Sequence, residues 1–130
     1  MYSSQLNSAM SKWNSYIGYD LFRAKNNSTT ADLIVSDVYD PDTIYYGVYQ
    51  HRTIGTDTLK FNTCYMGRIV ESNGYTLDLR RESVAAHELG HSLGLAHKGT
   101  FSDVMTTYET SYTFPSLNDM RSYAEASLNY

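Results

Sequence analysis

The sequence predicts a single domain of the α+β class, with helices at the beginning, in the second half and at the end of the chain. Three observations predict this class. An amphipathic helical pattern opens the chain, residues 31–66 are rich in β-branched and aromatic side chains, and two helix-forming stretches follow a turn near residue 74. A chain of 130 residues has the size of one domain with one core. We therefore expect residues 1–130 to form one folded unit.

The first helix is expected at the start of the chain. Its apolar residues recur at intervals of four, three and four, as the inner face of an amphipathic helix requires: Leu6, Met10, Trp13 and Ile17. Gly18 follows directly, and glycine readily adopts the left-handed conformation that commonly ends a helix. The sequence thus predicts a helix that stops at residue 18.

The strands are expected between residues 19 and 70. The candidate segments are residues 19–23, 31–38, 43–52, 58–66 and 68–70. The run Leu33-Ile34-Val35 has the character of a buried strand, and tyrosine, isoleucine and valine dominate residues 43–52. A turn at Asn73-Gly74 is expected to end this region.

Two further helices are expected after that turn. The longer one begins near Leu77 or Asp78 and ends near Leu93. The last one follows Ser116, which forms a capping pattern with Asp119 three positions later. The side chains of this last helix that are expected to face the core are Leu117, Met120, Ala124 and Leu128.

The run from His87 to His97 is the most specific chemical signal in the chain. Residues four apart on a helix lie about one turn apart on the same face, so His87 and His91 can offer imidazole nitrogens to one metal ion. Glu88 lies on the same turn. A zinc ion with three protein ligands keeps a position for a water molecule, which it makes easier to ionise, and the Glu88 carboxylate can complete that ionisation.

The third histidine of the run requires a bend in the chain. A straight helix would carry His97 about 9 Å past His91, because the rise is about 1.5 Å per residue. Gly94 stands where the chain must turn back, and glycine tolerates the conformation that such a turn needs. We therefore expect the helix to stop there and His97 to reach the metal from the following segment.

The motif and its surroundings resemble those of a known enzyme clan. Residues 87–97 match the pattern His-Glu-x-x-His-x-x-Gly-x-x-His of the metzincin metallopeptidases at every fixed position. Ser102-Asp103-Val104-Met105 looks like the tight turn that places a methionine beneath the metal in that clan. The distance of eight residues from His97 to Met105, with residues 108–114 and the last helix, resembles the matrixin branch, the family of the matrix metalloproteases.

This resemblance implies a zinc-dependent metalloendopeptidase that cleaves extended protein segments. The residues that it implies are three ligands of one catalytic zinc ion and a general base: His87, His91, His97 and Glu88. It also implies a zincin-like fold, in which a twisted mixed sheet with an antiparallel edge strand packs on three helices. Residues 59–66 are the candidate for that edge strand, which would pair with an extended substrate. An N-terminal subdomain (residues 1–94), a small C-terminal subdomain (95–130) and secretion are further expectations.

The sequence leaves two alternative functions open. One is a catalytically silent zinc-containing domain that binds peptides or proteins, although an intact Glu88 argues against it. The other is a metal-dependent exopeptidase or amidase that acts on small peptides. Both keep the same metal ligands, so the pattern alone does not distinguish them.

The chain departs from the matrixin pattern in three places. The second, structural zinc of matrix metalloproteases is bound through further histidines. Outside the motif this chain has only one histidine, His51, so such a zinc ion is not expected. Calcium is compatible with Asp37, Asp40 and Asp42, but these residues do not specify such a site, and a solvated turn is the favoured interpretation. Matrixins have a proline two residues after the methionine, where this chain has Thr107, and Tyr108 is a candidate for the wall of the specificity pocket.

Composition excludes several other classes of protein. A formal net charge of −4 provides no basic surface for nucleic acid, and no segment approaches the ~20 apolar residues that a membrane span needs. The N-terminus lacks the pattern of a signal peptide. Cys64 is the only cysteine, and we interpret it as a small buried thiol. We expect a monomer whose partner is a peptide or protein substrate.

Overall fold

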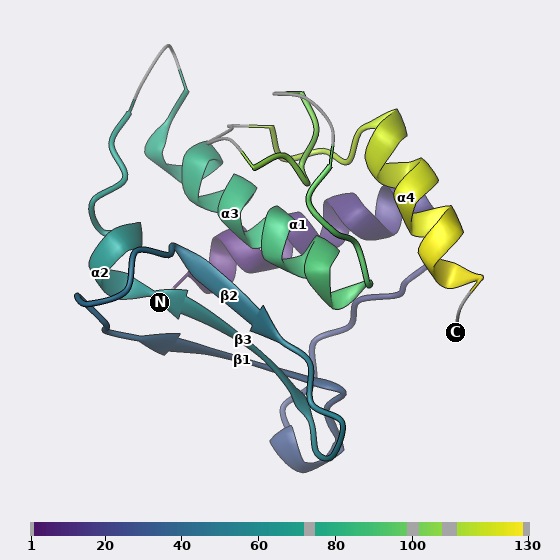
Figure 1. Ribbon diagram of the computed structural model, residues 1–130, viewed down its shortest axis with the longest axis horizontal. Helices are drawn as coiled ribbons and strands as arrows, with labels where there is room; N and C mark the ends of the chain where they lie inside the picture. Colours follow the sequence, from purple (N-terminus) through teal and green to yellow (C-terminus); the bar gives the residue numbers. More distant parts are fainter. Residues whose placement is uncertain (1, 72–74, 99–101, 108–111, 129–130) are drawn as a thin grey trace.

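The computed structural model describes residues 2–71, 75–98, 102–107 and 112–128, and it confirms the predicted α+β class (Figure 1). The elements in chain order are α1 (Ser3–Ile17), the 3₁₀ turn η1 (Ser28–Thr30), β1 (Leu33–Val38), β2 (Gly47–Gln50), β3 (Asp57–Asn62), α2 (Thr63–Met66), α3 (Leu77–Ser92) and α4 (Leu117–Ser127). The turn expected at Asn73-Gly74 lies outside the described residues. None of the described helices combines the length and apolar character that a bilayer crossing requires.

The sheet has three strands in the order β1-β3-β2. β1 runs parallel to β3, with Leu33 opposite Asp57, whereas β2 runs antiparallel to β3, with Tyr49 opposite Leu59. The mixed sheet and its antiparallel edge strand are confirmed, but the predicted position of that edge strand, residues 59–66, is wrong. β3 is the central strand, paired with β1 on one side and β2 on the other, with Leu59 and Phe61 in the core, and the antiparallel edge strand is β2.

Three segments that were predicted to be strands form other structures. Residues 19–23 form no strand, because the side-chain amide of Asn14 accepts from the Phe22 N–H and donates to the Phe22 carbonyl, each at 2.8 Å. At the end of β3, the Asn62 side chain accepts from the Cys64 N–H and starts the short helix α2. Residues 68–70 continue as a turn after that helix. In each case local hydrogen bonds take the backbone groups that a sheet would need.

Helix α1 forms as predicted and packs against α3. Ala9 and Trp13 are fully buried, and Gly18 ends the helix with a φ of 93°. The Trp13 indole N–H donates to the Ala86 carbonyl on α3 at 2.9 Å, inside the core. This bond fixes the distance between the two helices. In Figure 1, α1 lies behind α3 and the strands lie below them.

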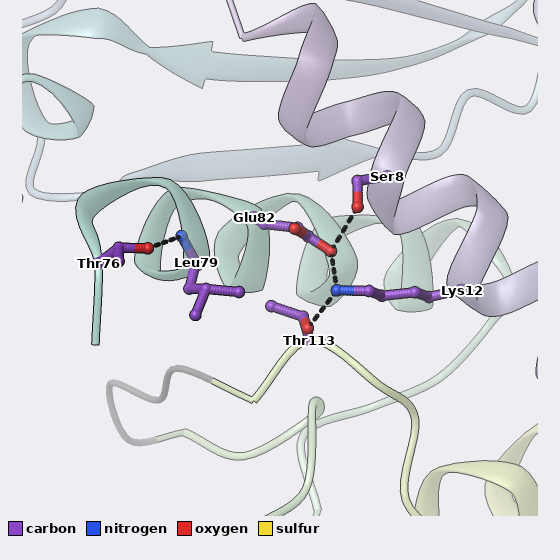
Figure 2. A network of polar contacts seen from close by, with 6 residues as sticks. All are labelled: Ser8, Lys12, Thr76, Leu79, Glu82 and Thr113. Atoms are coloured by element: carbon purple, nitrogen blue, oxygen red, sulfur yellow. Dashed lines mark hydrogen bonds and ion pairs between the residues drawn. The ribbon is translucent and has the colours of Figure 1, made fainter. Parts of the chain in front are cut away.

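A buried ion pair also joins α1 to α3 (Figure 2). Lys12 Nζ lies 2.5 Å from Glu82 Oε1, and the two side chains are only 18% and 9% exposed. Ser8 donates to the same carboxylate oxygen at 2.9 Å, and Lys12 donates to the hydroxyl of Thr113 at 2.7 Å. The network therefore ties residue 113, near the end of the chain, to both helices.

Helix α4 begins with the predicted capping box between Ser116 and Asp119. The predicted core face of this helix is confirmed at Met120, which packs against the core. It is wrong at Ala124, which is exposed, and at both ends, since Leu117 is 68% and Leu128 85% exposed. Tyr123 and Ala126 pack against the core in their place. The carboxylate of Asp119 is buried and bonded to the backbone of residues 104 and 105, and this anchor sets the rotation of the helix.

Candidate metal centre

Helix α3 carries the histidine motif toward the sheet. Thr76 caps its first turn, with its hydroxyl accepting from the Leu79 N–H, and the helix continues unbroken to Ser92. Gly94 then adopts a φ of 86°, a left-handed conformation that favours glycine, and the chain turns back. The Leu95 N–H donates to the Gly90 carbonyl at 3.1 Å and closes this turn. The predicted stop of the helix near Leu93 is therefore confirmed.

The turn brings the third histidine back to the first two. The Nε2 atoms of the three rings lie close together: 2.9 Å from His87 to His97, 3.2 Å from His91 to His87, and 3.2 Å from His91 to His97. In the part of the chain that the structure describes, this is the only group of three or more His, Cys, Asp or Glu side chains close enough to hold one metal ion. The residues that the sequence singled out therefore converge in space.

The other ring nitrogens fix the tautomer of the first two histidines in their neutral form. His87 Nδ1 lies 2.8 Å from the Val104 carbonyl, and His91 Nδ1 lies 2.7 Å from the Leu95 carbonyl. A carbonyl only accepts, so each Nδ1 carries the proton and each Nε2 presents a lone pair to the centre of the group. Lone pairs brought this close repel one another unless a cation lies between them, so the geometry fits a bound metal ion.

The surroundings of these rings favour the neutral imidazole that binds metals. Burial lowers the pKa of His87 to about 4, although the hydrogen bond to Val104 opposes the shift. Burial also lowers the pKa of His91, again against its bond to the Leu95 carbonyl. Imidazole nitrogens form a donor set that suits zinc.

The turn that contains Met105 packs against the helix that carries His87 and His91, as the sequence predicts. Met105 is 1% exposed, and a Cβ at Gly90 would overlap its sulfur, so the turn packs directly against α3. The Asp119 carboxylate accepts from the N–H groups of Val104 at 2.8 Å and Met105 at 3.1 Å. Asp119 thus holds the peptide whose carbonyl orients His87. The sequence identified Asp119 only as a helix cap, because nothing in its pattern shows this second contact.

Glu88 lies beside the histidines and is 7% exposed. Its Oε2 accepts from the backbone N–H of Tyr49 in β2 at 3.0 Å. Burial raises the pKa of Glu88 to about 7, and the bond from Tyr49 only partly offsets this effect. A cation at the histidines would lower that pKa again, because a nearby positive charge favours the carboxylate. A carboxyl group with a pKa close to neutral can both take and give a proton.

A cavity of about 190 Å³ opens next to Glu88 and the histidines. One wall is a face of α3, and the other walls come from residues 46–47 of the β2 segment, from Ile69 and from the turn after Met105. The residues that line it are Tyr46, Gly47, Ile69, Arg80, Ser83, Val84, His87, Glu88, His97, Thr106 and Thr107. Thr107 forms part of the wall, whereas Tyr108, the residue that the sequence suggested for the wall, lies outside the described residues.

Comparison with protein families agrees with the geometry of this centre. The matrixin (peptidase M10) family model matches residues 40–122, which is more than half of the chain and includes the histidines and the methionine turn. The chain belongs to the matrixin family. No curated protein matches the sequence. Membership implies that this matrixin is a zinc metallopeptidase, and its three histidines form a group that could bind the metal.

The other candidate residues of this matrixin lie outside the histidine group. His51 lies 3.1 Å from the Asp57 carboxylate, and no metal-binding group that includes it is found among the described residues. Asp40 accepts from the Asp42 N–H, and hydrogen bonds, first from the Thr43 side chain, lower the pKa of Asp40. This local bonding agrees with the favoured interpretation as a turn, and it does not test calcium binding. Cys64 is buried, as expected.

Proposed function

We propose that this matrixin is an endopeptidase in which His87, His91 and His97 hold one zinc ion and Glu88 is the general base. The convergence of three Nε2 lone pairs beside a buried carboxyl group carries this proposal. A zinc ion bound there would act as a Lewis acid that polarises the substrate carbonyl and promotes the ionisation of water.

Glu88 performs the proton transfers in this proposal. Its carboxylate takes a proton from the attacking water and then passes it to the amine nitrogen of the leaving segment. The Tyr49 N–H bonded to Oε2 holds the carboxylate in one orientation and leaves the other oxygen for the proton. The low exposure of Glu88 keeps this transfer away from bulk solvent.

Strand β2 is the proposed guide for the substrate. The N–H of Tyr49 points toward Glu88 rather than toward β3, and the carbonyl of Tyr46 accepts from Asn62 on β3. Because backbone groups alternate along an antiparallel strand, those of Gly47 and Tyr49 face away from β3, on the side of Glu88. An extended protein segment could add to this edge and place one peptide bond over the metal.

The experiment that tests this function compares the native chain with Glu88→Gln. We expect each protein to bind one zinc ion by metal analysis, and we expect only the native chain to cleave an unstructured protein such as casein. Glu125→Gln on α4 is the matched control and should cleave like the native chain. Cleavage by Glu88→Gln at the native rate would contradict the proposed role of Glu88 as the general base. A zinc-loaded native chain without activity would favour a silent binding domain.

The metal ligands need a separate test. We expect the zinc content to fall sharply in His87→Ala, His91→Ala and His97→Ala, and we expect His51→Ala to keep it. Mass spectrometry of the cleavage products should show internal cuts, because the proposed cleft accepts an extended segment. Products trimmed only at their ends would indicate an exopeptidase instead.

Two broader features belong to the same proposal. We propose a division into subdomains at residues 1–94 and 95–130. Gly94 reverses the chain at this boundary, and the cavity lies between α3 and the turn after Met105. Limited proteolysis that cuts first between these parts would support the division, and cuts elsewhere would contradict it. Matrixins are typically secreted, and we propose the same for this chain, to be tested by immunodetection in the culture medium and in cells.

A further inference from the structure

A second cavity, of about 480 Å³, borders the opposite face of α3 from the histidines. The α3 side chains that line it include Leu89 and Leu93, which helix geometry places on the other side of the helix from His87 and His91. The remaining walls come from α1, from residues 21–25, from β1 with the residues before it, and from Asp57. This cavity is therefore separate from the candidate metal centre.

β1 borders this cavity and is an edge strand. β3 pairs with one edge of β1, and no other described strand pairs with its second edge. In Figure 1, β1 is the lowest strand of the sheet. Backbone N–H and C=O groups at a strand edge can pair with an extended peptide. Since residues 21–25 run without a turn or bend and form a further wall, the space suits a single strand better than the edge of a second sheet.

The cavity has an apolar floor. Leu6 and Met10 of α1 line it together with Leu33 and Val35 of β1, and all four side chains are only partly buried. Leu33 and Val35 are two positions apart in a strand, so their side chains lie on the same face of the sheet. An occupant with an apolar side chain at every second residue would remove this surface from water.

Two cations lie on the wall formed by residues 21–25. Arg23 and Lys25 are exposed, and their side chains donate to backbone carbonyls, those of Asp20 and Thr30. Neither cation forms an ion pair within the described part of the chain. Side chains two positions apart in an extended segment share a face, and Phe22 between them packs against the core. A strand beside this wall would alternate in the same way.

Two carboxylates also line the cavity. Asp57 already accepts from the Tyr49 hydroxyl and the Arg52 N–H. Asp32 is exposed directly before β1, and its charge would repel an acidic occupant at that end of the cavity. Acidic side chains of an occupant are therefore expected beside residues 23–25 rather than at the start of β1.

We propose that this cavity binds one extended segment of a partner protein, which pairs with the open edge of β1 and alternates apolar with acidic side chains. The apolar side chains contact the floor between α1 and β1, and the acidic ones pair with Arg23 and Lys25. The proposal is independent of the proposed function, because neither Glu88 nor a proposed zinc ligand lines this cavity.

The test measures the binding of three end-blocked, fluorescently labelled peptides to the zinc-loaded Glu88→Gln chain, in which cleavage is not expected. Their sequences are Val-Glu-Val-Glu-Val, Val-Lys-Val-Lys-Val and Val-Val-Glu-Glu-Val, and the last keeps the composition of the first without its alternation. By fluorescence anisotropy, we expect the first to bind about tenfold more tightly than each of the others, since several weak charge contacts add up. Equal affinities or no saturable binding would overturn the proposal.

Hydrogen exchange locates the bound peptide. The amides of residues 33–38 should exchange more slowly when the alternating Glu peptide is bound, because strand pairing protects them. N-methylation of alternate peptide residues removes donors and should weaken binding by about tenfold. Protection confined to β2 and the region of Glu88 would place the peptide at the candidate metal centre and would contradict the proposal.

Charge reversal assigns the preference to the wall of the cavity. Arg23→Glu and Lys25→Glu should each weaken binding of the Glu peptide, and the double variant should prefer the Lys peptide. Arg121→Glu on α4 is the matched control, because Arg121 is exposed but does not line the cavity. Asp32→Asn should strengthen binding of the Glu peptide. An unchanged preference in the double variant would reject the roles of Arg23 and Lys25.

Sedimentation tests a different occupant, a second copy of this chain. The native chain without peptide should sediment as a monomer. A dimer that the double variant Arg23→Glu/Lys25→Glu dissociates would show that another copy fills the cavity, and it would overturn the proposal of a peptide segment. Thermal unfolding of each variant verifies that it is folded.

Discussion

The backbone N–H of Tyr49 donates to the carboxylate of Glu88 at 3.0 Å, so the edge strand of the sheet holds the proposed general base. The two residues are 39 positions apart in the chain. Next to this bond, Gly47 leaves room for the side chain of Glu88, since a Cβ at residue 47 would lie 2.8 Å from Glu88 Cγ. Strand β2 therefore both donates a hydrogen bond to the Glu88 carboxylate and leaves space for the Glu88 side chain.

Gly47→Ala should displace Glu88 and lower kcat. We expect a loss on the order of 10- to 100-fold, because a shift of about 1 Å in a reacting group has effects of this size. Zinc content should stay at one ion, since residue 47 is not a proposed ligand. Steady-state kinetics and metal analysis measure the two quantities. Val48→Ala, on the neighbouring residue, is the control, and an unchanged kcat in Gly47→Ala would contradict the fit described here.

Asp119→Asn should weaken zinc binding without touching a proposed ligand. The carboxylate accepts from three backbone N–H groups, those of Val104, Met105 and Ser116, and an amide can accept fewer of them. The Val104 carbonyl that orients His87 would then be less firmly held. We expect zinc affinity to fall by about 10- to 100-fold, as it does when partners of metal-bound histidines are lost.

Competition with a chromogenic chelator measures this affinity. Asp78→Asn is the control, because its exposed carboxylate accepts from Gln5 far from the methionine turn. A variant Asp119→Asn that is less stable but binds zinc with native affinity would show that Asp119 supports only the fold.

The ion pair between Lys12 and Glu82 should depend strongly on both partners. Lys12→Met leaves the buried Glu82 carboxylate without its cation, and we expect the free energy of unfolding to fall by about 3–5 kcal/mol. The double variant Lys12→Met/Glu82→Leu removes both charges and should recover most of this loss. Urea denaturation of the native chain, Lys12→Met, Glu82→Leu and the double variant measures the effect. Additive losses in the double variant would mean that the pair is not coupled.

Asp57 should make the stability of the β2–β3 hairpin depend on pH. The hydrogen bond from the Tyr49 hydroxyl, with that from the Arg52 N–H, lowers the pKa of Asp57 to about 2. A pKa lowered by folding means that the carboxylate stabilises the folded state above the unfolded pKa of about 4 and loses this effect as the pH falls toward 2. Tyr49→Phe should therefore destabilise the protein at pH 6 and much less at pH 2.

This comparison is made on the metal-free protein, so that loss of zinc in acid does not contribute. Chemical denaturation at several pH values gives the difference in unfolding free energy between the native chain and Tyr49→Phe. Tyr45→Phe serves as the control. A difference that stays constant from pH 6 to pH 2 would show that Asp57 has no part in it.

The sequence alone determined the features that depend on neighbours along the chain. The spacing of His87, Glu88 and His91 places them on adjoining parts of one helix surface, and Gly94 allows the reversal that returns His97. The capping box of α4 and the apolar stripe of α1 are local in the same sense. Helix geometry and backbone sterics act over a few residues, so the pattern was sufficient to predict them.

The tertiary structure decided the features that join distant residues. Only the fold makes β2 rather than residues 59–66 the edge strand, brings the Tyr49 N–H to Glu88, and directs Asp119 into the methionine turn. It also places Arg80 and Thr107, 27 residues apart, on the walls of one cavity. Strand pairing and burial depend on which surfaces meet after folding, and a periodic pattern along the chain does not contain that information.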